Sequence, residues 1–204
     1  MASLRDKNKR HDKFFKKARE GGYAARSVFK LEEIDKKFRL LRPGERVLDL
    51  GCRPGSWLKY AAGVVGRHGT VIGLDRAPLP AEIPGARALV GDVFTITDEE
   101  LLGDLRAFDA VLSDMAPDTT GVRSADQARS AALVEEALGR AERLLAPGGV
   151  FVAKVFQGPD VPAIRKRMEQ RFGEVFLYKP EASRSASTEV YLVGKSFVPS
   201  DAGP

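Results

Sequence analysis

Apolar residues follow two different spacings along this chain, and the two spacings alternate. Short runs rich in valine, leucine and phenylalanine have the length and composition of buried strands. Seven strands are predicted, over residues 46–50, 70–74, 86–90, 110–113, 150–156, 174–178 and 189–193. Apolar residues at helical spacing predict helices over residues 24–38, 56–66, 124–146 and 161–171. The alternation indicates an α/β fold, with a mostly parallel sheet and helices on both of its faces.

The last two predicted strands have no helical pattern between them. Residues 180–188 are therefore expected to form a hairpin-like return, which makes the last strand antiparallel. A length of 204 residues, 43% of them hydrophobic, suits one domain with a sizeable core, expected over residues 23–197. We expect residues 1–22 to form a mobile basic segment before it, and residues 198–204 to form a disordered tail.

One predicted strand contains a residue that its apolar pattern does not explain. Lys154 lies within VFVAKVF, residues 150–156, directly after a Pro-Gly-Gly turn. Burial disfavours the charged form of a lysine and lowers its pKa, unless a carboxylate compensates. Alternatively, Lys154 lies at the end of the strand and its ammonium group reaches water. The strand alone leaves both interpretations open.

Positive charge is concentrated at the start of the chain. Residues 1–46 hold 15 Lys and Arg against 7 Asp and Glu, a balance of +8, whereas residues 47–204 hold 18 against 21, a balance of −3. Phe14, Phe15 and Tyr23 are interleaved with these cations, a combination suited to phosphate pairing and base stacking. A solvated tail would also be charged, but the aromatic residues favour nucleic acid as the partner.

Composition argues against membrane insertion and metal chemistry. No run approaches the roughly 18 consecutive apolar residues of a membrane-spanning helix, and the first residues lack the apolar segment of a signal peptide. The protein is therefore expected to be soluble and cytoplasmic. One cysteine, Cys52, and two histidines, His11 and His68, form no recognisable ligand cluster, so no metal site is expected.

Glycines and acids follow the predicted strands, at the edge where α/β sheets bind ligands. Gly51 and Gly55 follow the first strand, and the next helix directs free backbone N–H groups toward the same place. Asp75, Asp92 and Asp114 end the next three strands. Asp75 can accept hydrogen bonds from ribose hydroxyls, and Asp92 can accept one from an adenine amino group. A tight turn explains the glycines, and a solvated turn explains any one acid. Together they indicate an adenosine-containing ligand.

Five segments carry a resemblance to one family. They are YAARSVFKL (23–31), DLG (49–51), SDMAP (113–117), VAKVFQG (152–158), and SRS (183–185) leading to EVY (189–191). They resemble the FtsJ/RrmJ family of S-adenosylmethionine-dependent RNA ribose 2′-O-methyltransferases, over about residues 12–195. The resemblance implies a Rossmann-like class I methyltransferase fold and S-adenosylmethionine as cofactor.

By resemblance, the catalytic group is a Lys-Asp-Lys-Glu tetrad, which corresponds here to Lys30, Asp114, Lys154 and Glu189. Methyl transfer from a sulfonium to a ribose hydroxyl is an in-line displacement, so the enzyme must align two reactants and remove a proton. Lys154 can accept that proton or hold the developing alkoxide, and Lys30 can orient the hydroxyl. The two acids then fix the ammonium groups. The sequence does not decide which member takes the proton, because four interacting groups titrate jointly.

The resemblance assigns cofactor contacts to Gly51, Gly55, Trp57, Asp75, Asp92 and Asp114. Three residues depart from the family pattern. Arg53 replaces a small residue and either projects from the pocket or crowds it, and Ser56 replaces a glycine and can cap the next helix. Asp118 replaces an asparagine that is common in the family, and its charge is expected to weaken RNA binding slightly.

The resemblance also suggests a substrate. The short chain, with no appended domain, is most similar to bacterial members that methylate a uridine in the A loop of 23S ribosomal RNA in the large subunit, and a monomer suffices. Transfer RNA is the alternative substrate. A second basic group is interpreted as the solvated face of a helix rather than as an RNA patch: Arg165, Lys166, Arg167 and Arg171.

Two other classes of protein share some of these features. A non-catalytic ribosome-assembly factor would use the basic segment, but it would not need an intact tetrad. A nicotinamide oxidoreductase would use a similar sheet, but the G-x-x-x-G spacing of Gly51 and Gly55 and the lack of an evident catalytic histidine argue against it.

Overall fold

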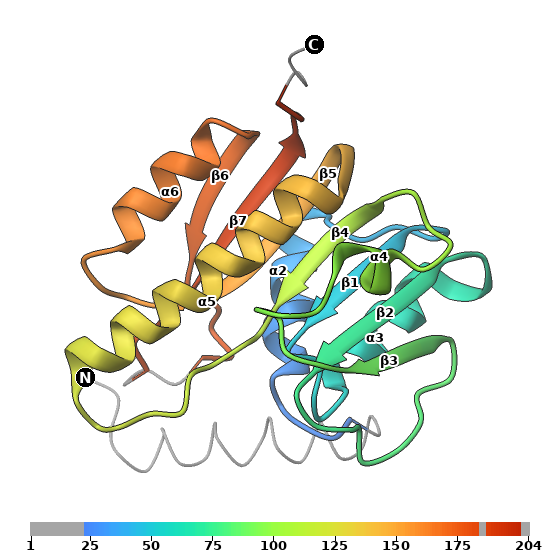
Figure 1. Ribbon diagram of the computed structural model, residues 1–204, viewed down its shortest axis with the longest axis horizontal. Helices are drawn as coiled ribbons and strands as arrows, with labels where there is room; N and C mark the ends of the chain where they lie inside the picture. Colours follow the sequence, from blue (N-terminus) through green and yellow to red (C-terminus); the bar gives the residue numbers. More distant parts are fainter. Residues whose placement is uncertain (1–22, 184–186, 201–204) are drawn as a thin grey trace.

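The computed structural model describes residues 23–183 and 187–200. Among these residues, seven strands form one sheet in the order β3-β2-β1-β4-β5-β7-β6 (Figure 1). β7 pairs antiparallel with both β5 and β6, whereas the other neighbouring strands are parallel. The strands are β1 (Arg46–Leu50), β2 (Thr70–Asp75), β3 (Ala86–Val90), β4 (Phe108–Ser113), β5 (Leu145–Phe156), β6 (Phe172–Tyr178) and β7 (Glu189–Phe197).

Helices cover both faces of the sheet and enclose two apolar cores. α4, α5 and α6 pack on one face, where Leu138 and Phe151 are fully buried, and α2 and α3 pack on the other, around Leu31 and Leu58 (Figure 1). β1 and β4 are almost continuously buried because both of their faces are covered. The helices are α2 (Val28–Phe38), α3 (Ser56–Val65), α4 (Asp98–Leu102), α5 (Arg123–Leu144) and α6 (Val161–Glu169), with a 3-10 turn, η1 (Gly66–His68).

The predicted fold class is confirmed, with corrections at the ends of elements. The predicted helix 24–38 begins only at Val28, and the predicted helix 161–171 ends at Glu169. The predicted helix 124–146 ends at Leu144, because Leu145 already pairs with Phe108 in the sheet. The hairpin-like return between β6 and β7 is confirmed by their antiparallel pairing.

The helix α4 was not predicted from the sequence. It has five residues, which is too short for an apolar period to be recognised. A capping box defines its start: the Thr97 hydroxyl accepts from the backbone of Glu100, whose carboxylate accepts from the backbone of Thr97. The basic segment 1–22 and residues 201–204 of the tail lie outside the described residues, so their expected mobility and disorder are untested.

Candidate active site

Strand alternation directs Lys154 toward α2. Side chains two positions apart on a strand share a face, and Val150 and Val152 pack in the core beneath α2 and α3. Lys154 lies on the same face and is only 6% exposed. Its partner in the β5–β7 register is Tyr191. Lys154 is therefore a buried lysine within the sheet, and the snorkelling interpretation is wrong.

The four residues of the expected tetrad form two ion pairs. The Nζ atom of Lys154 donates to the carbonyl oxygen of Asp114 at 2.6 Å and lies 3.0 Å from its Oδ1 atom. The Nζ atom of Lys30, on the buried side of α2, lies 2.7 Å from Oε2 of Glu189. Burial alone would raise the pKa of Glu189. Attraction and hydrogen bonding to Lys30, with attraction to Lys154, outweigh burial and hold this pKa below its ordinary value.

Tyr191 connects the two pairs, although it was not among the residues expected in the site. Its hydroxyl donates to Oδ1 of Asp114 at 2.9 Å, and its ring centroid lies 5.8 Å from Nζ of Lys30. Burial, with repulsion from Asp114 and Glu189, raises its pKa well above the ordinary value, so the hydroxyl stays a donor. Alternation gave a usable signal, because Tyr191 lies two residues after Glu189 on one strand.

The segment before α2 is tied to α3, which positions Lys30. Nε1 of Trp57 donates to the carbonyl oxygen of Ser27 at 3.0 Å, and the backbone of Ala25 donates to Oγ of Ser56 at 2.7 Å. Ser56 was expected to be able to cap α3, but Gly55 occupies the N-cap position and no side chain caps the helix. The Ser56 hydroxyl instead holds the chain that leads to Lys30.

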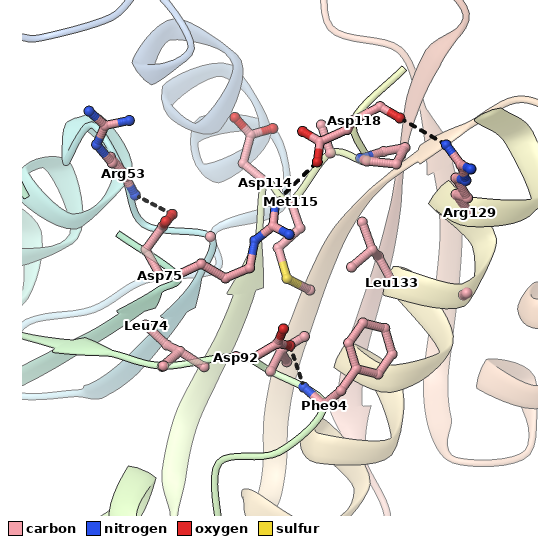
Figure 2. Close-up of a pocket in the computed structure, with 17 residues that line it drawn as sticks. Arg53, Leu74, Asp75, Asp92, Phe94, Asp114, Met115, Asp118, Arg129 and Leu133 are labelled. Atoms are coloured by element: carbon pink, nitrogen blue, oxygen red, sulfur yellow. Dashed lines mark hydrogen bonds and ion pairs between the residues drawn. The ribbon is translucent and has the colours of Figure 1, made fainter. Parts of the chain in front are cut away.

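A cavity of about 680 Å³ lies beyond the carboxyl ends of β1, β2, β3 and β4 (Figure 2). Four of the expected cofactor residues line it: Gly51, Asp75, Asp92 and Asp114. Gly55 and Trp57 are not among its lining residues. Gly55, with φ +104°, packs beneath the side chain of Ile83, and Trp57 is buried against Tyr191 at a ring distance of 5.9 Å. Their assigned contacts stay predictions.

Backbone groups hold the two acids that were assigned to ribose and adenine. Oδ2 of Asp75 accepts from the backbone of Arg53 at 3.0 Å and its Oδ1 from Ala77 at 3.1 Å, while Oδ1 of Asp92 accepts from Phe94 at 3.0 Å. A carboxylate has about four acceptor sites, so each acid can accept further bonds. The guanidinium of Arg53 points away from the cavity (Figure 2), so Arg53 does not crowd the pocket.

Asp49 is a third acid, close to Asp75 and Asp114 of this cavity. Asp49 of β1 is fully buried, and neither carboxylate oxygen has a hydrogen bond among the described residues. Burial, with repulsion from Asp114 and Asp75, raises its pKa well above the ordinary value. A cationic ligand in the cavity would relieve this repulsion, whereas an anionic pyrophosphate would increase it.

Asp118, which departs from the family pattern, belongs to the rim of the same cavity. Its Oδ2 lies 3.7 Å from a guanidinium nitrogen of Arg76, and its carbonyl oxygen accepts from Arg129 (Figure 2). Both side chains are largely exposed, so this pair is weak. The expected slight loss of RNA affinity stays a prediction.

A second cavity, of about 350 Å³, borders the other ion pair, because Glu189 is part of its lining. Asp114 lines the first cavity and is paired with Lys154, while Glu189 lines the second and is paired with Lys30. The charged cluster therefore touches both cavities. Such an arrangement can bring a donor in one cavity to an acceptor in the other.

The fold and this cluster define an α/β enzyme of the Rossmann-like methyltransferase class, with its ligand cavity at the carboxyl ends of the strands. The chain belongs to the FtsJ-like methyltransferase family, whose model matches residues 23–197. The resemblance inferred from the five sequence segments is confirmed.

The names of similar proteins are consistent with this family. The chain is 50% identical to ribosomal RNA large subunit methyltransferase E of Desulfatibacillum aliphaticivorans, over 93% of this chain and 92% of the relative. It is 49% identical to the enzyme of the same name from Sorangium cellulosum, over 91% and 88%. A putative ribosomal RNA methyltransferase from Plasmodium falciparum has a similar crystal structure, with a TM-score of 0.77 and 26% identity, covering 87% of this chain and all of that chain.

Proposed function

We propose that this protein transfers a methyl group from S-adenosylmethionine to a ribose 2′-hydroxyl of ribosomal RNA. The observation that carries the proposal is the cluster of two buried lysines, Lys154 and Lys30, with the partly exposed acids Asp114 and Glu189, between two cavities. The names of relatives 50% and 49% identical to this chain support RNA of the large ribosomal subunit as the substrate.

The first cavity would hold the cofactor. Asp75 and Asp92 would accept hydrogen bonds from its ribose and adenine, and the acids near Gly51 would favour its positive charge. When bound, the cofactor supplies an electrophilic methyl group on a sulfonium. The protein's part is to exclude water and to align the acceptor oxygen with that group.

Lys154 is proposed to meet the ribose hydroxyl. Two contacts to Asp114 hold its ammonium group, and an ammonium has three donors. One position is therefore left for the acceptor oxygen. There, Lys154 as a neutral amine would take the hydroxyl proton, or as a cation would stabilise the alkoxide. Lys30, fixed by Glu189, would orient the hydroxyl from α2.

The remaining expectations about the substrate and setting belong to the same proposal. The target is a uridine in the A loop of 23S ribosomal RNA within the large subunit, and the protein acts as a cytoplasmic monomer. In the second basic group, Arg165 pairs with Glu169 on α6, and Arg167 pairs with Glu135 and Glu142 of α5. These acidic partners support the expectation that the group is not an RNA patch. No described helix is both long and apolar enough to cross a membrane.

The test uses labelled S-adenosylmethionine with three RNA substrates: unmodified large ribosomal subunits, free ribosomal RNA and transfer RNA. Ribose methylation is expected on the ribosomal substrates. Transfer to transfer RNA alone would establish the alternative substrate. No transfer to any RNA, despite cofactor binding, would leave a non-catalytic assembly factor.

Replacement of the buried lysine tests the mechanism. Lys154→Ala is expected to abolish transfer and to leave cofactor affinity within a few-fold of wild type, because Lys154 does not line the first cavity. Lys166→Ala, at an exposed position on α6, is the matched control and should retain full activity. Turnover near wild type in Lys154→Ala would show that the role assigned to Lys154 is wrong.

A further inference from the structure

The second cavity lies where the base of a bound nucleotide would have to be. In a nucleotide the base and the 2′-hydroxyl are attached to adjacent carbons of the ribose. A hydroxyl that reaches Lys154 therefore brings its base to the edge of the charged cluster. The first cavity is taken by the proposed cofactor, and the second borders Glu189 of the cluster. Its lining is Thr119, Gly121, Arg123, Asp126, Gln127, Phe156, Ser187, Thr188 and Glu189.

The walls of this cavity are held by hydrogen bonds. The backbone of Phe156 donates to Oγ of Ser130 at 2.9 Å, which fixes the end of β5 against α5. The backbone of Gln157 donates to the carbonyl oxygen of Thr188 at 2.8 Å, which joins this end to the start of β7. The half-buried ring of Phe156 is therefore held by a rigid strand end and can pack against the face of a base.

Asp126 holds the opposite wall. One carboxylate oxygen accepts from the backbone and the hydroxyl of Thr120, at 2.8 and 2.9 Å, and the other accepts from the backbone of Gly121 at 3.2 Å. These bonds, the one from the Thr120 backbone most of all, keep the pKa of Asp126 below its ordinary value. Asp126 is thus committed to the loop. The guanidinium of Arg123 is a cation on the same wall, able to donate to carbonyl oxygens or phosphate.

The structure also defines the orientation of the Gln127 amide in this cavity. Its Nε2 atom donates to the carbonyl oxygen of Gln157 at 2.5 Å. A carbonyl can only accept, so this bond decides which end of the amide is nitrogen. The amide oxygen and the second hydrogen of Nε2 can then serve a ligand.

Gly158 allows Gln127 to adopt this position. A Cβ atom at residue 158 would lie 3.1 to 3.2 Å from Cβ, Cγ and Cδ of Gln127, which is tighter than an ordinary contact. The glutamine stem lies directly on this glycine. A methyl group there would push the glutamine stem by a few tenths of an ångström and so shift the amide relative to the carbonyl of Gln157, without removing any chemical group from the cavity.

We propose that the second cavity binds the base of the nucleotide to be methylated, unstacked from its neighbours, and that Gln127 is a specificity-determining residue contacting the hydrogen-bonding edge of that base. The proposal rests on the proposed function, because it assumes a ribose hydroxyl at Lys154. Phe156 covers the face of the base, and the oriented amide of Gln127 presents one acceptor and one donor to its edge.

The test compares Gln127→Ala and Gly158→Ala with Gln170→Ala, a control at the exposed C-cap glutamine of α6. Unmodified large ribosomal subunits are the substrate, and methylated positions are mapped along the RNA. Loss of the base contact is expected to lower kcat/KM for RNA about tenfold in either variant, the size of a good hydrogen bond, with the KM for S-adenosylmethionine unchanged. Methyl groups should also occur at neighbouring nucleotides. The double variant should lose little more than either single one, because both act through one contact.

The outcomes distinguish failure of the base-binding role from failure of the proposed function. If wild type methylates RNA while both variants keep wild-type efficiency and position, the base-binding role is overturned and the proposed function survives. If wild type methylates no RNA, both proposals fail. Circular dichroism checks the fold. If Gln127→Ala does not fold, Gly158→Ala alone tests the base-binding role, because that variant keeps every chemical group of the cavity.

Discussion

Replacing Tyr191 with phenylalanine isolates a single hydrogen bond in the charged cluster. The ring is fully buried, so Tyr191→Phe keeps the packing on Trp57 and the position over Lys30. It removes the hydroxyl that donates to Asp114 at 2.9 Å. A hydrogen bond to a charged group contributes about 1.5–3 kcal/mol. Because the side chain of Asp114 is 16% exposed, water replaces part of this bond, and the lower value of about 1.5 kcal/mol applies.

For a domain of this size, a loss of about 1.5 kcal/mol corresponds to a decrease in Tm of about 3–6 °C. The pKa of Tyr191 is raised, so the folded state favours its protonated form. The advantage of wild type over Tyr191→Phe should therefore be full below the ordinary value of 10.0 and decline at higher pH. Because Asp114 also positions Lys154, kcat for methyl transfer should fall about tenfold, with little change in the KM for RNA.

Thermal unfolding and steady-state methyl transfer measure the two effects. Tyr60→Phe is the matched control, since its hydroxyl donates to Asp35 at 2.8 Å, outside the charged cluster. It should lower Tm to a similar extent and leave kcat unchanged. If Tyr191→Phe unfolds and turns over like wild type, the hydroxyl does not hold Asp114, and the reasoning is wrong.

Two further predictions concern acids of the site. Asp49→Asn should make the cofactor-free protein more stable, and the gain should grow as pH rises above 3.8, the ordinary pKa of an aspartate. The reason is that the pKa of Asp49 is raised in the folded state, so its ionisation opposes folding. The same variant should bind S-adenosylmethionine more weakly, and calorimetry measures both effects. Glu189→Gln should lose a stabilisation that wild type keeps in full above about pH 4.5, because the pKa of Glu189 is lowered. Unfolding by guanidinium chloride from pH 3 to 7 should show that the difference in free energy of unfolding between wild type and Glu189→Gln becomes smaller at acid pH. A difference that does not depend on pH would contradict the ion pair with Lys30.

Residue pattern was enough to predict most of the fold and the strand-end acids that line the first cavity. Asp75, Asp92 and Asp114 were recognised because parallel strands end at one edge, and all three line the first cavity. Gly55 and Trp57 were assigned by resemblance and are not part of that lining. The short helix α4 and the ends of α5 were missed, because capping and strand pairing decided them rather than apolar periodicity.

The partners of Tyr191 and Gln127 and the burial of Asp49 were not predictable from the sequence, although strand alternation places Tyr191 on the same face as Glu189. The partner of Tyr191 is 77 residues away, and the buried state of Asp49 follows from helices packing over both faces of β1. Gln127 meets Gln157 only because α5 runs beside the end of β5.

Apolar spacing and strand-end residues therefore predicted an α/β domain that binds a cofactor at the carboxyl ends of its strands. Both predictions follow from the spacing of residues within a few positions along the chain. The apolar spacing also marked Lys154 as an unusual residue. Whether it was buried, which carboxylate it met and where an acceptor could bind were decided by the tertiary structure. The reason is that the β5–β7 register and the packing of α2 bring together side chains from residues 30, 114, 154 and 189, and the energy of charges in a low-dielectric interior depends on such distances.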